Sequence, residues 1–260
     1  MADPAAAALA SPADEAVPAL AVEDVFQHVA GHAVLNGVSL RVQPREGVLL
    51  IGRNGAGKSL LMRLALGLDR PSAGRVRLFG EELGRLRGQR SRALRRRIGA
   101  VLQRGSLLDG LTVLENLLLP LRSTRMPRAD MARAARLVMT QLQLDGMENH
   151  LPRALSVGQQ RRVELARALV HRPDLLIWDG LTDGLDLPAV REIFGLLRAE
   201  MEVRGLTVIA TDNLALEAIH ADERVVVLDR GRVLFDGNRR DLEAAAPGRL
   251  ELRYLLEGRW

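Results

Sequence analysis

Short apolar runs alternate with amphipathic stretches over most of the chain, and this pattern predicts strands that alternate with helices. Mostly apolar runs at residues 48–51, 175–178 and 206–210 are typical of strands covered on both faces. Helical spacing separates the runs, most clearly over residues 161–170, which Pro173 ends. The chain is therefore expected to adopt an α/β fold with a mostly parallel sheet.

The pattern near the N-terminus is different. Two alternating runs lie on either side of Gly31 within residues 22–42 and predict a pair of antiparallel strands. Residues 75–79 add a short strand, so an N-terminal antiparallel β subdomain is expected. Residues 1–20 are rich in alanine and proline without any period, and we expect them to form a disordered tail.

Two helical regions are expected beside this core. Residues 111–121 and 129–142 have helical spacing and predict a separate helical lobe, and residues 242–256 predict one C-terminal helix. Other predicted elements are helices at 59–68, 91–97 and 187–203, a strand at 98–102, and a hairpin formed by 224–228 and 232–235. The predicted organisation is a tail at 1–20, a main domain at 21–240 with its lobe at about 104–160, and a helical extension at 241–260.

The helix predicted over residues 161–170 has one apolar face. Val163, Ala166 and Val170 mark that face, which should be buried. The charged residues of the same helix are expected to point to solvent; they are Arg161, Arg162, Glu164 and Arg167.

Composition narrows the classes of protein. The 260 residues include no cysteine, which excludes disulfides and thiolate metal sites. The net charge of +5 comes from arginines spread along the chain, and only 3% of residues are aromatic, which is poor for stacking on bases. We therefore expect no nucleic-acid partner. No stretch approaches the roughly 18 apolar residues of a membrane span, and no signal peptide is evident, so a membrane role would require a partner.

A glycine-rich stretch joins the strand at 48–51 to the next helix and matches G-x-x-x-x-G-K-[ST]. In such a loop, main-chain N–H groups and a helix N-terminus bind phosphate. Lys58 is the only lysine in the chain, and a compact ammonium suits phosphate oxygens in a way that a planar guanidinium does not. The predicted nucleotide-binding residues are Gly52, Arg53, Asn54, Gly55, Ala56, Gly57, Lys58, Ser59 and Leu60.

A magnesium ion is expected beside this loop. Ser59 would supply a hydroxyl ligand. Asp179 follows the buried strand at 175–178 and would supply a carboxylate, as in phosphoryl-transfer sites that hold a nucleoside triphosphate with Mg²⁺.

The order of these motifs resembles that of the ABC-transporter ATPases, from about Val22 to Gly237. The resemblance implies ATP and Mg²⁺ as ligands, with Gln103 touching the metal or the attacking water. Residues 155–160, Leu-Ser-Val-Gly-Gln-Gln, stand where the family has its signature, which caps the γ-phosphate of ATP held by a second subunit. The residues that would act in this way are Ser156, Val157, Gly158 and Gln159, and Asp186 would lie in the D-loop along the dimer seam.

The same resemblance implies partners and a location. It predicts a second ATPase subunit, identical or different, and an integral membrane permease at the cytoplasmic face of the inner membrane. Residues 103–116, 117–121 and 250–258 look most like the Mla-type ATPases. That likeness implies a lipid or another hydrophobic substrate and an Mce-type substrate-binding protein, although import and lipoprotein-release ATPases share much of the pattern.

Several positions depart from the family pattern. Gly180 stands in place of the glutamate that polarises water, Leu181 in place of proline, Asp212 in place of the histidine that contacts the γ-phosphate, and Val157 in place of the first signature glycine. The aromatic residue that stacks on adenine falls at Val29, which leaves Phe26 or His28 as substitutes. The departures predict that MgATP binds but is hydrolysed slowly.

Two other outcomes are open. Asp183 or Asp212 could act as the base and give a fully active ATPase. The basic net charge would also suit a non-transport ABC protein that works on ribosomes or DNA, but such proteins usually carry two cassettes or a long coiled-coil insertion. This chain has one cassette and neither addition.

Overall fold

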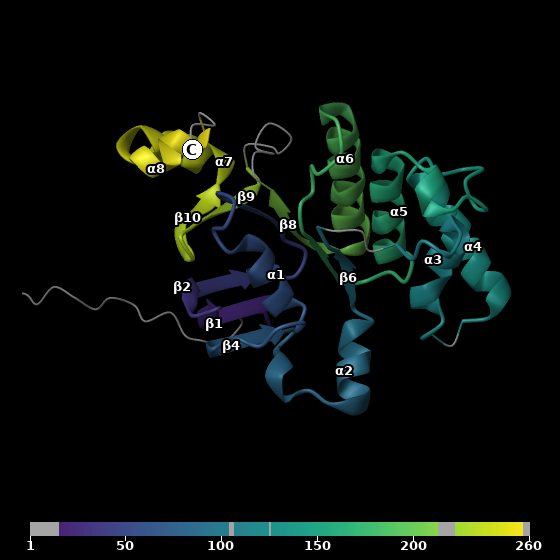
Figure 1. Ribbon diagram of the computed structural model, residues 1–260, viewed down its shortest axis with the longest axis horizontal. Coiled ribbons are helices and arrows are strands. Elements are labelled where there is room, and N and C mark those ends of the chain that lie inside the picture. Colours follow the sequence, from purple (N-terminus) through teal and green to yellow (C-terminus); the bar gives the residue numbers. More distant parts are fainter. Residues whose placement is uncertain (1–15, 104–106, 125, 213–221, 257–260) are drawn as a thin grey trace, which may run out of the picture.

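The computed structural model describes residues 16–103, 107–124, 126–212 and 222–256. The strands form two sheets, and helices lie on both sides of the larger one (Figure 1). Five of its six strands run parallel to one another, and the sixth pairs antiparallel at one edge. The prediction of an α/β fold with a mostly parallel sheet is confirmed.

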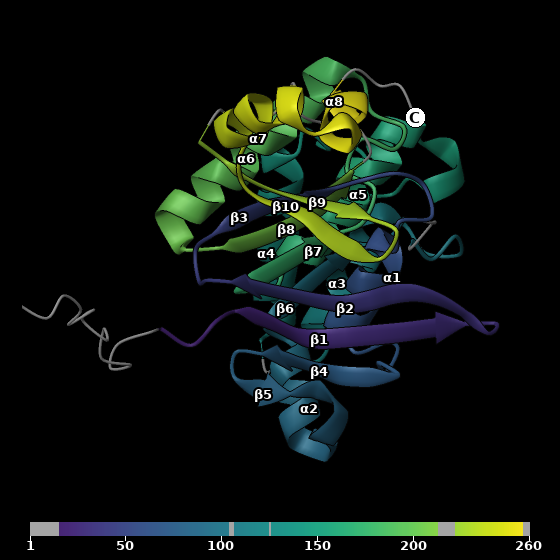
Figure 2. The same ribbon diagram turned by 90° about the vertical axis from the view of Figure 1, so that its left-hand side faces the viewer.

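The smaller sheet is antiparallel and has the strand order β2-β1-β4-β5. Its strands are β1 (Leu20–Val29), β2 (His32–Val42), β4 (Ala73–Leu78) and β5 (Glu81–Glu82). Figure 2 shows β1, β2 and β4 side by side, next to the larger sheet. Ala19 and Leu20 are fully buried. The tail predicted over residues 1–20 is therefore too long at its C-terminal end, and its residues 1–15 lie outside the described chain.

The larger sheet has the order β10-β9-β3-β8-β7-β6. Its strands are β3 (Gly47–Ile51), β6 (Ile98–Val101), β7 (Leu175–Trp178), β8 (Thr207–Asp212), β9 (Arg224–Asp229) and β10 (Arg232–Asn238). Alternate residues of β3 enter two different cores: Val48 and Leu50 pack toward the antiparallel sheet, while Leu49 and Ile51 face the opposite core. Burial on both faces explains why these strands read as continuous apolar runs.

Most helices fall close to their predicted ranges. Helix α1 follows β3, and α3 and α4 pack on α5, as expected for the lobe. The helices outside the C-terminal region are α1 (Lys58–Ala65), α2 (Gly88–Arg95), α3 (Val113–Leu121), α4 (Arg128–Gln141), α5 (Val157–Leu169) and α6 (Leu187–Arg204). Within the described ranges, no helix combines the length and the apolar character that a membrane crossing requires.

Helix α5 differs from the prediction in two ways. It begins at Val157 rather than Arg161, because Ser156 and Gln159 form a capping box that starts the helix one turn earlier. Arg161 and Glu164, which were expected to face solvent, are buried at 8% and 3% exposure. The buried face is wider than the apolar positions alone suggest, since a charge pair occupies part of it.

The single helix predicted over residues 242–256 is divided in two. Helix α7 (Arg239–Ala245) ends in a 3₁₀ turn, Ala246–Gly248, and α8 (Leu250–Leu256) follows. Pro247 lies inside that turn. Proline lacks an N–H donor and disfavours the helical conformation of the residue before it, which accounts for the break.

Candidate functional site

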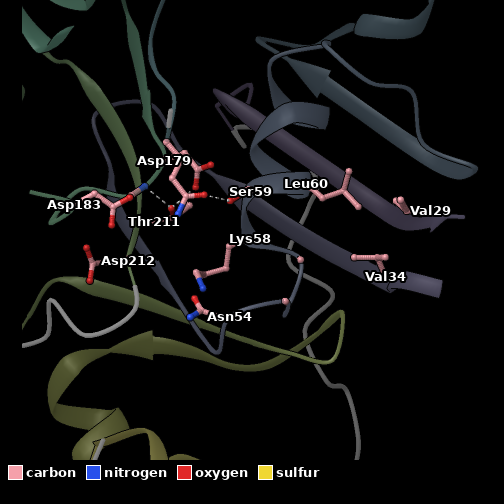
Figure 3. Close-up of a pocket in the computed structure, with 14 residues that line it drawn as sticks. Val29, Val34, Asn54, Lys58, Ser59, Leu60, Asp179, Asp183, Thr211 and Asp212 are labelled. Carbon is pink, nitrogen blue, oxygen red and sulfur yellow. Dashed lines mark hydrogen bonds between the residues drawn. The ribbon is translucent and has the colours of Figure 1, made fainter. Parts of the chain in front are cut away.

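The glycine-rich loop between β3 and α1 forms one wall of a cavity of about 360 Å³ (Figure 3). Gly57 ends the loop with φ at +104°, and a Cβ there would press on the Leu35 side chain. Glycine is therefore required where the loop enters α1. The predicted residues that line the cavity are Asn54, Gly55, Gly57, Lys58, Ser59 and Leu60, whereas Gly52, Arg53 and Ala56 complete the loop behind them.

Lys58 is the first residue of α1 and is only 9% exposed. Its ammonium donates hydrogen bonds to the carbonyl oxygens of Gly52, at 2.6 Å, and Arg53, at 3.1 Å. Burial lowers the pKa of Lys58, and the charges of three aspartates act in the opposite direction; these are Asp179, Asp212 and Asp183. A single ammonium thus faces three carboxylates across the cavity (Figure 3).

The three predicted metal ligands also line this cavity. Ser59 Oγ lies 3.5 Å from Gln103 Oε1, and the Asp179 carboxylate adjoins them. Hydroxyl, amide and carboxylate oxygens are ligands that Mg²⁺ accepts, together with phosphate oxygens and water. No cluster of three acidic, histidine or cysteine side chains that could hold a metal occurs among the described residues. Ser59, Gln103 and Asp179 would hold a magnesium ion together with phosphate oxygens.

Thr211 belongs to the site, although the sequence did not draw attention to it. Its hydroxyl donates a 2.5 Å hydrogen bond to Asp179 Oδ1 and accepts one from the Gly180 N–H at 2.9 Å. A threonine at the end of the apolar strand β8, only 1% exposed, was the available signal. Thr211 therefore restricts the orientation of the Asp179 carboxylate, since its hydroxyl donates to one carboxylate oxygen.

Gly180 adopts a left-handed conformation, with φ at +76°. A Cβ at this position would overlap Oδ2 of Asp183 and crowd Gln103. The Asp183 N–H donates to the Gly180 carbonyl oxygen at 3.2 Å, so the loop turns tightly here. As a result, the Asp183 carboxylate fills the space in which a side chain at residue 180 would begin.

Asp212 is the last residue of β8 and is 3% exposed. Its Oδ2 accepts a 2.8 Å hydrogen bond from the Thr182 N–H. The carboxylate therefore holds the loop after Asp179 while it also lines the cavity. The family resemblance implies a histidine at this position, which would not add a negative charge to the cavity.

The far end of the cavity is apolar. Val29 and Val34 line it together with Leu60 (Figure 3). Phe26 and His28, the candidates to replace the adenine-stacking aromatic, are not among the lining residues, and the Phe26 ring covers Gly37 instead. A base placed here would contact aliphatic side chains.

The signature residues lie away from this cavity, at the start of α5. Ser156 Oγ accepts from the Gln159 N–H at 3.2 Å, and Gln159 Oε1 accepts from the Ser156 N–H at 2.9 Å. Gly158 lies beside Leu185, and Val157 is 60% exposed with its side chain against Gly184. One chain does not bring the loop and the signature together, which is compatible with a role in trans.

Asp186, predicted for the D-loop, has a clear local contact. Its Oδ1 accepts a 2.9 Å hydrogen bond from the Ala189 N–H and caps α6. It does not line the cavity. The residue before it, Leu185, lies beside Gly158 of the signature.

Arg161 connects the signature helix to the site. It pairs with Glu164 at 2.9 Å and donates to the carbonyl oxygens of Asp183 at 3.1 Å, Gln103 at 3.0 Å and Leu102 at 3.2 Å. A second ion-pair contact, 3.6 Å long, reaches Asp183 Oδ2. One guanidinium therefore joins α5 to the two segments that carry Gln103 and Asp183.

Comparison with known proteins shows which family of proteins the chain belongs to. Residues 35–183, more than half of the chain, match the family model described as ABC transporter. The fold is similar to the dimeric structure of MJ0796, a bacterial ABC transporter cassette, with a TM-score of 0.79 and 29% identity over 85% of this chain and 99% of that one. The fold is also similar to a post-hydrolysis structure of the same cassette bound to ADP and Pi, with a TM-score of 0.78.

The curated relatives are longer than this chain. The methionine import ATP-binding protein MetN of Mesorhizobium japonicum is 41% identical over 208 residues, which cover 78% of this chain and 56% of the relative. MetN of Caulobacter vibrioides is 38% identical over 207 residues, covering 80% and 62%. The chain thus spans less than two thirds of the length of these proteins. Their names describe methionine import, so they lend no support to the Mla-type likeness, to lipid transport or to an Mce partner.

Proposed function

This chain belongs to the ABC transporter family, and we propose that it is an ATP-binding subunit that takes up MgATP, dimerises and couples these steps to an integral membrane permease. The observation that carries the proposal is that the glycine-rich loop and the predicted metal ligands line the same cavity. Lys58 and the N-terminus of α1 face it from one side, while Gln103 and Asp179 face it from the other. Binding of a triphosphate with Mg²⁺ needs a cation, N–H donors and metal ligands that all face the same cavity.

We propose further that hydrolysis at this chain's own cavity is slow. No side chain is present at Gly180, and Asp212 places a carboxylate where the family resemblance implies a histidine. Removal of a positioned base commonly lowers a rate by about 10²–10⁴-fold. Nucleotide binding relies on main-chain groups and Lys58, so it should persist.

For the transported substrate, we propose an import role of the kind named for the MetN relatives, with the chain at the cytoplasmic face of the inner membrane. The 41% identity to a methionine import protein supports it. The hydrophobic-substrate role implied by residues 103–121 is the alternative. Stimulation of ATP turnover by methionine or by phospholipid, in vesicles that contain the permease, separates the two.

The proposal is tested by measuring MgATP binding and turnover on the same purified protein. Calorimetric titration should show saturable binding that weakens when Mg²⁺ is removed. Steady-state phosphate release should be slow at saturating MgATP. Absence of saturable binding would overturn the proposed function, and rapid turnover would overturn only its second part. Affinity capture from membranes should retain an integral membrane permease; capture of ribosomes instead would favour the non-transport alternative.

A further inference from the structure

We propose that Asp183 takes over the place left by the residue missing at position 180 and contacts the water that attacks the γ-phosphate, with Arg161 as its positioning residue. The inference rests on the proposed function, because it names the group through which the slow hydrolysis would run. It assigns Asp183 a catalytic role and Arg161 a role exerted through Asp183.

The first argument is the occupied space. A side chain at Gly180 would start where Asp183 Oδ2 now lies, and both residues line the cavity with Ser59, Gln103 and Asp179. The tight turn that brings Asp183 back needs the left-handed conformation of Gly180. The absence of a side chain at residue 180 therefore leaves the space that the Asp183 carboxylate occupies.

The second argument is that Asp183 is held on both its backbone and its side chain. Arg161 Nε donates to the Asp183 carbonyl oxygen at 3.1 Å, and Arg161 Nη2 lies 3.6 Å from Oδ2. Arg161 is itself fixed by Glu164, and the side chains of this pair are 10% and 4% exposed. A planar guanidinium with several donors can hold the carboxylate and its loop together. Such support limits the orientations that the carboxylate can adopt.

The third argument concerns Gln103. Arg161 donates to its carbonyl oxygen at 3.0 Å, while the Gln103 side chain reaches Ser59. Arg161 therefore contacts both Gln103 and Asp183, and both of these residues line the cavity. A shift of Arg161 would move both.

Asp212 is the competing carboxylate, and its surroundings suit it less. It is 3% exposed and already accepts the Thr182 N–H. The Asp183 side chain, in contrast, is 39% exposed, so water can reach it. A group that accepts a proton from water must contact that water.

The chemical step is a hydrolysis. The water oxygen forms a bond to the γ-phosphorus, and the bond from that phosphorus to the β–γ bridging oxygen breaks, leaving its electron pair on ADP. The proton released by the water passes to the Asp183 carboxylate and then to solvent. Mg²⁺, when bound, neutralises charge on the phosphate oxygens.

Single-turnover hydrolysis of γ-labelled ATP by the full chain tests the role of Asp183. Asp183→Asn should lower the rate by about 10²-fold, and MgATP affinity measured by calorimetry should change little. Asp183→Glu should retain part of the rate. The matched control is Asp174→Asn, which removes another arginine-paired aspartate, 53% exposed on the surface beside Arg97, and should leave the rate unchanged. Equal rates for wild type and Asp183→Asn, or no turnover in a wild type that binds MgATP, would overturn the inference.

The positioning role of Arg161 is tested by comparing Arg161→Lys with Arg161→Gln. If the residue acts through Asp183, Arg161→Gln should lower kcat with little change in KM, and Arg161→Lys should recover part of kcat because it keeps a cation near Asp183. A merely structural role would lower the melting temperature in both and leave kcat per folded protein unchanged. Failure of wild-type MgATP binding would overturn the proposed function as well, whereas MgATP binding followed by turnover that does not depend on Asp183 would overturn only this inference.

Discussion

The two walls of the cavity are built in different ways. Residues 52–60 contact it through a glycine-rich backbone, a helix N-terminus and one ammonium, whereas the opposite wall consists of side chains from separate strands and loops, among them Gln103, Asp179, Asp183 and Asp212. Main-chain groups persist whatever side chains surround them, but a single substitution removes a side-chain function. Under the proposed function, this difference would let nucleotide binding persist on one wall while substitutions on the other slow hydrolysis.

The opposite wall should depend strongly on Arg161 for its stability. Arg161→Met removes one partner of a buried pair and leaves Glu164 without its cation, which commonly costs about 3–5 kcal/mol of unfolding free energy. Urea denaturation measures this loss. The double variant Arg161→Met with Glu164→Leu should recover much of it, since the carboxylate that lost its ion-pair partner is then removed as well.

A surface pair with the same spacing provides the control. Arg133 and Asp130 are also three residues apart and 2.6 Å from each other, but their side chains are 81% and 42% exposed. Arg133→Met should cost about 1 kcal/mol or less. Equal losses at the two sites would contradict the view that burial makes Arg161 important.

On the loop wall, MgATP binding should depend most strongly on Lys58. Lys58→Ala removes the cation that faces three carboxylates, and the loss of a charged hydrogen bond of about 1.5–3 kcal/mol weakens MgATP binding by roughly tenfold to a hundredfold. Lys58→Arg should also bind poorly, because a guanidinium does not fit the place of an ammonium at 9% exposure. Titration calorimetry measures both, with exposed Arg90→Ala as the control. Unchanged affinity of Lys58→Ala would remove the basis of the comparison.

The same contrast decides what the sequence could predict. The loop wall is local in sequence, so its pattern predicted a loop between a strand and a helix, and the structure has Ser59 and Leu60 of that segment lining the cavity. The strands were predictable because both faces of the sheet are covered. The predictions for residues 1–20 and 242–256 were less accurate. Burial of Ala19 in the tertiary structure shortens the predicted tail, and Pro247 divides the predicted C-terminal helix.

The opposite wall was harder to predict, because its contacts join distant segments. Periodicity placed Arg161 on the solvent side, yet its partners include Leu102 and Asp183, which lie far from it in the chain. Thr211 gave only a weak signal. The left-handed turn at Gly180 could not be predicted from the sequence, because a glycine in place of another motif residue does not specify its φ angle.

Gly180 leads to a third prediction, and it reverses a simple expectation. From the family pattern alone, Gly180→Glu with Asp212→His should raise hydrolysis. The structure argues against this, because any side chain at φ +76° is strained and would meet the Asp183 carboxylate. We expect both Gly180→Glu and Gly180→Ala to lose about 1–3 kcal/mol of stability, and turnover of the grafted double variant not to rise. Gly195→Ala, within α6 and with open space around it, should instead gain up to about 1 kcal/mol. Thermal unfolding and phosphate release measure these outcomes.

The smallest expected effect separates two roles of the signature. Ser156→Ala breaks the capping box of α5 and should cost about 1 kcal/mol. Thr112→Ala breaks an equivalent capping box, formed with Glu115 at the start of α3, and should cost about the same. If Ser156 also contacts nucleotide held by a second subunit, only Ser156→Ala should weaken MgATP-dependent dimerisation in analytical ultracentrifugation. Identical dimerisation of the two variants would limit Ser156 to capping its own helix. Contacts to nucleotide held by the second subunit would then have to come from other residues.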